Sequence, residues 1–446
     1  MADNTNVSLR NRVIYQVYVR NHSEEGTFKA LEADLDRIKD LGVDMIHLLP
    51  VHPIGKKNRK GLLGSPYAIS DYRAINPELG TMEDFTGLVR SMHERGIGCV
   101  MDIVYNHTSP DSVLSRDHPG WFYHKPDGGF GNRIGEWWDV IDLDYGDPGS
   151  GLWDYQIETL VMWAKIVDGF RCDVAPLVPL EFWRCARQKV AEVNPGCVWI
   201  AESVEPSFIL ENRARGFVCH SDAEMFGAFD VCYDYDIFGF YQKYLDGSLD
   251  LASYAERINA QEYLYPANYV KLRNLENHDR NRAAFSIANE RALRNWTAFN
   301  YFQKGLTLIY AGQEEAARNR PSLFEKDPVE WNAGLSGAVS GGPANTGAPA
   351  SGKDLSGLMR VLYRIKKDPL FASSSYEVRA GADGMMLASH RSGSRSLFGV
   401  FSLKGRAGVV PVPEGQYVNL IDGSVFRTGD GRMSHSGEPV IFEYTE

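Results

Sequence analysis

Carboxylates at or near the ends of apolar runs occur in four places along the chain, and in three of them an arginine or a histidine lies close by in the sequence. Arg171 and Asp173 are two residues apart in Gly-Phe-Arg-Cys-Asp-Val-Ala (169–175), so in a strand both side chains point to one face. An adjacent arginine lowers the pKa of an aspartate, so we predict that Asp173 is ionised at neutral pH, as a nucleophile or charge stabiliser must be. By itself this pair is typical of a structural ion pair, and the other three places change that interpretation.

Each of the other three places is an apolar run that ends in clustered polar residues. The runs are 99–104 before Tyr105-Asn106-His107, 198–201 before Glu202, and 270–275 before Glu276-Asn277-His278-Asp279. Polar residues that repeatedly follow strands are typical of a (β/α)8 barrel, whose active site lies at the C-terminal ends of its strands. Asp173, Glu202 and Asp279 are then expected to converge. Such carboxylates are what glycoside hydrolysis through a covalent intermediate requires.

The order and spacing of these stretches resemble the signature regions of the α-amylase superfamily, glycoside hydrolase family 13. The resembling stretches are DIVYNH (102–107), GFRCDVA (169–175), AES (201–203), ENHD (276–279), the tyrosine-containing SPYAISDYRAINPELGT (65–81) and IDLD (141–144). The resemblance extends from residue 13 to about residue 370. It implies an α/β fold: a (β/α)8 barrel with a small domain inserted after its third strand.

The resemblance also implies a role for each polar residue. Asp173 corresponds to the nucleophile, Glu202 to the general acid/base, and Asp279 to the carboxylate that holds hydroxyls of the reacting sugar and helps to distort its ring. The implied substrate-binding residues are the stacking tyrosine Tyr67, the hydroxyl-binding His107 and His278, Arg171, and Asp102, which orients that arginine.

A structural calcium ion is also implied, with Asn106 and Asp142 as its ligands. Both offer the hard oxygen atoms that Ca²⁺ prefers. The alternative is that Asn106 only caps a turn, and the sequence leaves both readings open. No organic cofactor is expected.

The predicted activity is retaining hydrolysis of α-1,4-glucosidic bonds in maltooligosaccharides or starch fragments. Many α-amylases have Lys-His where this chain has Pro176-Leu177, so a contact on the leaving side is missing and short substrates are expected to be preferred. Two alternatives stay open. One is a transglycosylase or a sucrose- or trehalose-type isomerase on the same scaffold. The other, more remote, is a non-catalytic carbohydrate-binding or transporter-associated homologue.

Composition agrees with a large globular enzyme that acts on a neutral substrate. The chain has 446 residues, a formal net charge of −11 and a pI of about 5.6, which argues against nucleic-acid binding. The six cysteines lack C-x-x-C spacing, and residues 1–12 lack an apolar signal core. We therefore expect a cytoplasmic enzyme without membrane association. A signal peptide removed beforehand would change that expectation, and the sequence is compatible with a monomer or a dimer.

Three units are expected along the chain. Residues 1–370 should form the barrel, 106–148 the inserted domain, and 371–446 a C-terminal antiparallel β-sandwich, because short alternating strands there are separated by Asp-Gly turns. Within the barrel, 31–41 has the spacing of one helix, and the Gly/Ala/Ser/Pro-rich segment 333–352 is predicted to be a mobile loop. The basic loop at 56–60 is expected to be solvated or to form a rim over the cleft.

Overall fold

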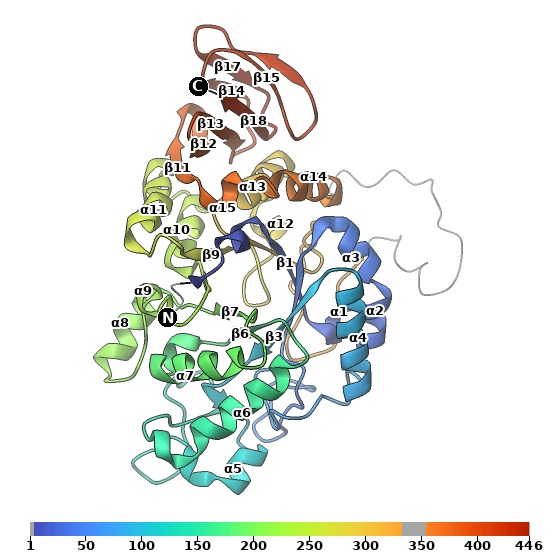
Figure 1. The fold of residues 1–446 in the computed structure, drawn as a ribbon, viewed down its shortest axis with the longest axis vertical. Coiled ribbons are helices and arrows are strands. Elements are labelled where there is room, and N and C mark those ends of the chain that lie inside the picture. The colour runs from blue at the N-terminus through green and yellow to red at the C-terminus, as the bar shows by residue number, and fades with distance from the viewer. Residues whose placement is uncertain (1–3, 332–353, 446) are drawn as a thin grey trace.

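Eight parallel strands close into a barrel in this computed structural model, which describes residues 4–331 and 354–445. The order around the barrel is β1-β10-β9-β8-β7-β6-β3-β2, as the sequence predicted for a (β/α)8 fold (Figure 1). The strands are β1 (Val13–Val17), β2 (Met45–Leu48), β3 (Gly98–Ile103), β6 (Gly169–Cys172), β7 (Val198–Ala201), β8 (Val231–Tyr233), β9 (Val270–Arg273) and β10 (Leu306–Tyr310).

Helices surround this barrel. They are α1 (Val19–His22), α2 (Phe28–Ala33), α3 (Leu35–Gly42), α4 (Met82–Glu94), α6 (Leu152–Ala164), α7 (Leu180–Ala191), α8 (Pro206–Ala214), α9 (Asp222–Met225), α10 (Tyr235–Leu245), α11 (Leu251–Leu264), α12 (Ala283–Ser286), α13 (Glu290–Phe302), α14 (Ser356–Lys366) and α15 (Leu370–Ser373). Short 3₁₀ helices occur at Val7–Asn11, Pro119–Trp121, Pro148–Ser150, Ala175–Leu177 and Ala382–Gly384.

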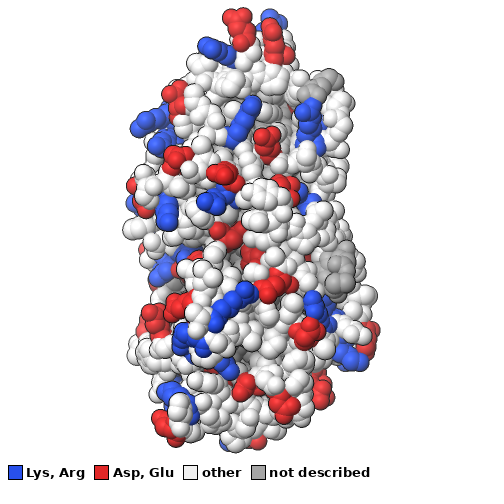
Figure 2. All heavy atoms as spheres, turned by 90° about the vertical axis from the view of Figure 1, so that its left-hand side faces the viewer, with Lys and Arg blue, Asp and Glu red and all other residues white. Residues whose placement is uncertain are grey.

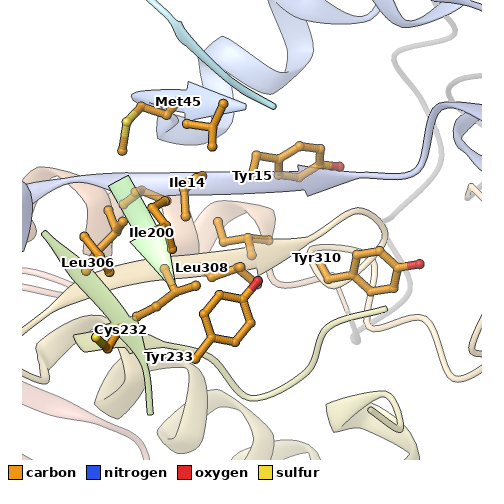
Figure 3. Packing of buried hydrophobic residues seen from close by; sticks show 14 of the residues in the cluster. Ile14, Tyr15, Met45, Ile200, Cys232, Tyr233, Leu306, Leu308 and Tyr310 are labelled. Atoms are coloured by element: carbon orange, nitrogen blue, oxygen red, sulfur yellow. The ribbon is translucent and has the colours of Figure 1, made fainter. Parts of the chain in front are cut away.

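The interior of the barrel is a packed core rather than a channel. Figure 3 shows buried side chains from β1, β2, β7, β8 and β10, some inside the barrel and some between the strands and the helices, and every labelled residue is at most 2% exposed. Because apolar side chains at the centre hold the strands rigidly, polar residues at the strand ends are positioned by backbone geometry rather than by mobile loops.

The insertion after β3 is held at both of its ends. Strand β4 (His107–Thr108) pairs antiparallel with β5 (Ile141–Asp142), and His107 lies opposite Asp142. The helix α5 (Val113–Asp117) lies between them. Phe122 is buried and packs against Phe130, as expected for a small core of its own, whereas Trp138 is 54% exposed.

The C-terminal region is built from antiparallel strands, also as predicted. A four-stranded sheet has the order β11-β12-β13-β18, and two further pairs are β14-β17 and β15-β16. Side chains from the sheet and from both pairs form one apolar cluster, so the layers pack face to face. The strands are β11 (Ser375–Ala380), β12 (Met385–Ser392), β13 (Arg395–Ser402), β14 (Gly408–Pro411), β15 (Gln416–Val418), β16 (Val425–Arg427), β17 (Arg432–His435) and β18 (Val440–Thr445).

This C-terminal sheet also packs on the barrel. Tyr376, Val378 and Phe401 belong to the same core cluster as the barrel strands. The Asn259 side chain of α11 donates to the Val378 carbonyl at 2.7 Å and accepts from its N–H at 2.9 Å. Figure 1 shows the sheet stacked against the end of the molecule formed by α11, α13 and α15.

The structure differs from the sequence prediction at residues 31–41, which are not one helix. α2 ends before Asp34 and α3 begins after it, because the Asp34 carboxylate bonds His22 at 2.9 Å and Arg37 at 2.7 Å. The predicted loop 333–352 lies outside the described residues. No helix in the described part of the chain is long and apolar enough to cross a membrane. Acidic and basic side chains are interspersed on the face in Figure 2, without a broad basic field.

Candidate active site

One buried arginine connects three carboxylates at the C-terminal ends of adjacent strands. Arg171 Nη1 donates to Asp102 Oδ1 at 2.8 Å and to Asp173 Oδ1 at 2.9 Å. Its Nη2 lies 2.8 Å from Glu202 Oε1, although the angle there is not that of a hydrogen bond. Because β3, β6 and β7 are neighbours in the barrel, the sequence-predicted cluster forms at one point on the rim.

Glu202 is oriented by a strained residue next to Asp173. Val174 has φ 34° and ψ 42°, in the left-handed region that a β-branched residue rarely adopts. In this conformation the Val174 N–H donates to Glu202 Oε2 at 2.8 Å. Backbone strain of this kind concentrates at functional sites, and here it fixes the second oxygen of the glutamate.

Burial raises the pKa values of both central carboxyls. The pKa of Asp173 rises to about 7 because burial outweighs Arg171, with Asp102 and Asp279 adding repulsion. The pKa of Glu202 rises to about 8, mainly through burial and then through repulsion from Asp173 and Asp279. Arg171 does lower the pKa of Asp173, as predicted, but burial outweighs this effect, so the prediction of a low pKa and an ionised Asp173 at neutral pH was wrong. The pair holds a proton near neutral pH and titrates as a unit.

Asp279 has the opposite electrostatic setting. Enclosure in the cleft works toward a higher pKa, but His278 and Arg171 lower the pKa of Asp279 to about 2. His278 Nε2 lies 3.1 Å from Asp279 Oδ2, and the same nitrogen is 2.6 Å from the Tyr67 hydroxyl. The Tyr67 ring stacks on the His278 ring at 5.4 Å. Tyr67, His278 and Asp279 therefore form one polar wall beside the Arg171 cluster.

Both histidines that face the aspartates, His107 of β4 and His47 of β2, are buried and neutral. Burial lowers the pKa of His107 to about 4, and its Nε2 lies 3.8 Å from Asp173 Oδ2. His47, which the sequence analysis did not single out, lies 3.2 Å from Asp102 Oδ2, and burial lowers its pKa too. Neutral imidazoles can donate a hydrogen bond to a sugar hydroxyl or a carboxylate without adding charge.

The cleft above these residues has a volume of about 330 Å³. Eight of its lining residues were not predicted from the sequence as site residues. They are Lys60, Ser65, Trp137, Asp139, Val140, Val174, Leu323 and Phe324. The basic loop at 56–60, which contains Lys60, was a candidate for a rim over the cleft, whereas no periodicity or motif distinguishes Asp139, Leu323 and Phe324.

The predicted calcium ligands come together, but an arginine lies with them. Asn106 and Asp142 line a second cavity of about 250 Å³. Arg133 donates from its backbone N–H to Asp142 Oδ2 at 2.7 Å, and its Nη1 donates to the Leu143 carbonyl at 3.2 Å and lies 3.5 Å from Asp142 Oδ2. Asp142 Oδ1 is buried without a hydrogen-bond partner.

This donor set fits Ca²⁺ poorly. The described residues contain no group of three or more His, Cys, Asp or Glu side chains arranged to hold a metal. The Arg133 guanidinium, held against the Tyr123 ring at 4.7 Å, already places a positive charge beside Asp142. A divalent ion at Asp142 would lie against that charge.

An eight-stranded barrel with buried carboxylates and a stacking tyrosine at the C-terminal ends of its strands defines a carbohydrate-active enzyme. Comparison with known proteins agrees. Residues 9–123 match the family model for the alpha amylase catalytic domain, and residues 377–442 match that for the bacterial alpha amylase C-terminal domain. The chain is 43% identical to an alpha-amylase from Lactobacillus plantarum, with a TM-score of 0.91 over 98% of this chain and 100% of the other. The chain belongs to the alpha-amylase family.

Two further relatives have names that describe different activities. A noncanonic maltogenic alpha-amylase from Thermotoga neapolitana is 30% identical, with a TM-score of 0.83 over 98% of this chain and 100% of that one. An alpha-1,4-glucan:maltose-1-phosphate maltosyltransferase from Myxococcus xanthus is 32% identical over 213 residues, which are 42% of this chain. The match spans about a third of that curated relative, 32% of its length.

Proposed function

We propose that this protein is a retaining α-glucan hydrolase that cleaves α-1,4-glucosidic bonds of maltooligosaccharides or starch fragments. The observation that carries the proposal is the contact of one guanidinium with both Asp173 and Glu202, at 2.9 and 2.8 Å. Because one guanidinium contacts both, the two carboxyl groups lie close together on the same side of the cleft, as the retaining arrangement requires. Retention needs about 5–5.5 Å between them, whereas inversion needs a wider gap to admit a water molecule.

In this proposal Asp173 attacks the anomeric carbon and Glu202 protonates the departing glycosidic oxygen. The shared proton of the pair supplies both states at once, since one carboxyl is ionised while the other is protonated. Water deprotonated by Glu202 then hydrolyses the glycosyl-enzyme. Asp279, ionised and facing the cleft, accepts hydrogen bonds from hydroxyls of the reacting sugar, and Tyr67 stacks on its face.

The test is to neutralise each carboxyl without changing its shape. We expect Asp173→Asn and Glu202→Gln each to lower kcat on maltopentaose by about a hundredfold or more. The matched controls are Asp246→Asn and Glu211→Gln, because both residues are exposed and neither lines the cleft. Residual activity above about a tenth in either site variant, with the fold intact by circular dichroism, would refute these roles.

A second candidate function is transfer to a sugar acceptor instead of water. The observation that favours it is an apolar cluster next to the pair, in which Val174, Val204 and Ile209 pack with Trp137 and Leu177. An apolar surface beside the acid binds a sugar face better than it orders water. Analysis of products from maltose at high concentration distinguishes the two, because transfer yields oligosaccharides longer than the substrate.

A further inference from the structure

The direction of the substrate chain through the cleft follows from the position of the acid. If Glu202 protonates the departing oxygen, as the proposed function holds, then the leaving part of the substrate lies on the β7 side. In the closed barrel β1 is four strands from β7 in either direction, and β2 and β10 flank β1. The non-reducing part of the substrate therefore points toward the loops that follow β2 and β10.

These two loops are joined to each other. The Leu63 N–H donates to the Phe324 carbonyl at 3.0 Å, and the Leu62 N–H donates to Glu325 Oε1 at 2.9 Å. The chains approach so closely at Gly61, with φ 65°, that a Cβ there would lie 2.6 Å from Glu325 Oε1 and 2.7 Å from the Phe324 Cβ. The loops after β2 and β10 thus form a continuous wall at this end of the cleft.

A buried arginine from the body of the barrel anchors both loops. Arg20 is 1% exposed and forms an ion pair with Glu78 at 2.8 Å. Its Nη1 donates to the Gly64 carbonyl at 3.2 Å and to the Leu323 carbonyl at 3.4 Å. Because one rigid side chain holds a carbonyl of each loop, the wall is fixed relative to the catalytic residues.

An ion pair connects this wall to the insertion. Lys60 Nζ lies 2.7 Å from Asp139 Oδ1, and the two side chains are 24% and 5% exposed. This enclosure makes the pair stronger than a surface ion pair, which is worth little. Lys60 also lies 5.4 Å from the Trp138 ring, and Asn58 Nδ2 contacts the Trp138 carbonyl at 3.5 Å. Lys60 and Asp139 both line the cleft above the reacting position.

We propose that the joined loops after β2 and β10, together with the Lys60–Asp139 ion pair, close the non-reducing side of the cleft. The enzyme then removes short units from non-reducing chain ends instead of cutting within chains. An open groove lets a polymer continue past the reacting sugar on both sides. A wall allows only a chain end to enter. The inference rests on the proposed function, because the position of the acid sets the direction.

The experiment compares two maltoheptaosides that differ only at the non-reducing end, one free and one blocked by a cyclic acetal on O4 and O6. We expect the free substrate to be cleaved at least about a hundredfold faster, with a single short product at early times. Equal cleavage of both would refute the inference that the non-reducing side of the cleft is closed, but it would not contradict the proposed function. Cleavage of neither would refute the proposed function itself, and the inference with it.

Variants test whether these residues form the barrier. Lys60→Ala combined with Phe324→Ala should raise the ratio of blocked to free cleavage at least tenfold. Lys57→Ala is the matched control, because Lys57 is exposed on the same loop, and the ratio should stay unchanged there. An unchanged ratio in a folded double variant would show that other residues exclude the blocked end. The wild-type comparison decides the inference even if the double variant fails to fold.

Discussion

The proton held by Glu202 makes a prediction about stability that is independent of activity. The pKa of Glu202 is raised to about 8 by burial, whereas an unfolded glutamate titrates near 4.5. Between these values the folded protein binds a proton that the unfolded chain has released, so stability falls as pH rises. One such proton contributes about 1.4 kcal/mol per pH unit. Glu202→Gln removes this contribution, since the amide does not titrate.

From pH 5.5 to pH 7.5 the wild-type protein should therefore lose about 3 kcal/mol of unfolding free energy more than Glu202→Gln does. The assay is urea denaturation of both proteins at intervals of half a pH unit. Asp173 titrates as a unit with Glu202, so the difference between the two proteins reports the proton balance of the pair.

The control is Glu211→Gln, which alters an exposed glutamate of α8 and should leave the pH dependence of the wild type unchanged. Parallel stability curves for wild type and Glu202→Gln would refute the reasoning. They would mean that Glu202 is ionised in the folded protein at neutral pH. Glu202 would then lack the proton that an acid catalyst must donate.

The remaining predictions concern activity and metal. Hydrolysis of an α-linked maltooligosaccharide should release the α-anomer first in an NMR time course, and β-product first would remove Asp173 as nucleophile. The profile of kcat/KM against pH should be bell-shaped. Its acid limb should lie near pH 7, where the Asp173–Glu202 pair takes up a second proton, and its alkaline limb near pH 8, where the pair loses its last one; a flat profile between pH 5 and 9 would contradict this. Excess EDTA should leave the melting temperature unchanged, whereas Arg133→Ala should lower it by about 1–2 °C; a drop with EDTA and calcium in the purified protein would identify Asp142 Oδ1 as a ligand. Maltopentaose should have a higher kcat/KM than amylopectin, and the reverse order would disprove a closed cleft.

The sequence predicted the parts of the site that strand periodicity controls. Arg171 and Asp173 lie at the end of β6 and Glu202 at the end of the neighbouring β7, so they come together because strand ends in a barrel meet at one rim. Lys60 and Phe324 could not be predicted in this way, because they belong to loops whose positions depend on contacts between segments more than 250 residues apart. Opposed loops leave no periodic signal along the chain.

The direction of the Asp173 pKa shift also could not be predicted from the sequence. The sequence shows an arginine two residues from Asp173. It does not show that the pair is buried, or that Arg171 also contacts Asp102 and Glu202. The break in helix 31–41 has a similar cause. Asp34 looks like an ordinary helical residue, and the sequence does not show that the His22 side chain contacts its carboxylate. In both cases a tertiary contact outweighs a local preference.

The packing of the C-terminal sheet on the barrel has a consequence for how the protein unfolds. Since Val378 and Phe401 belong to the same apolar cluster as the barrel strands, separating the two regions exposes apolar surface on both. Cooperativity should then extend across residue 370, with one calorimetric transition instead of two. A chimaera that joins this barrel to the sheet of a relative would have to reproduce the Asn259–Val378 contact and its apolar surroundings, or lose the shared transition.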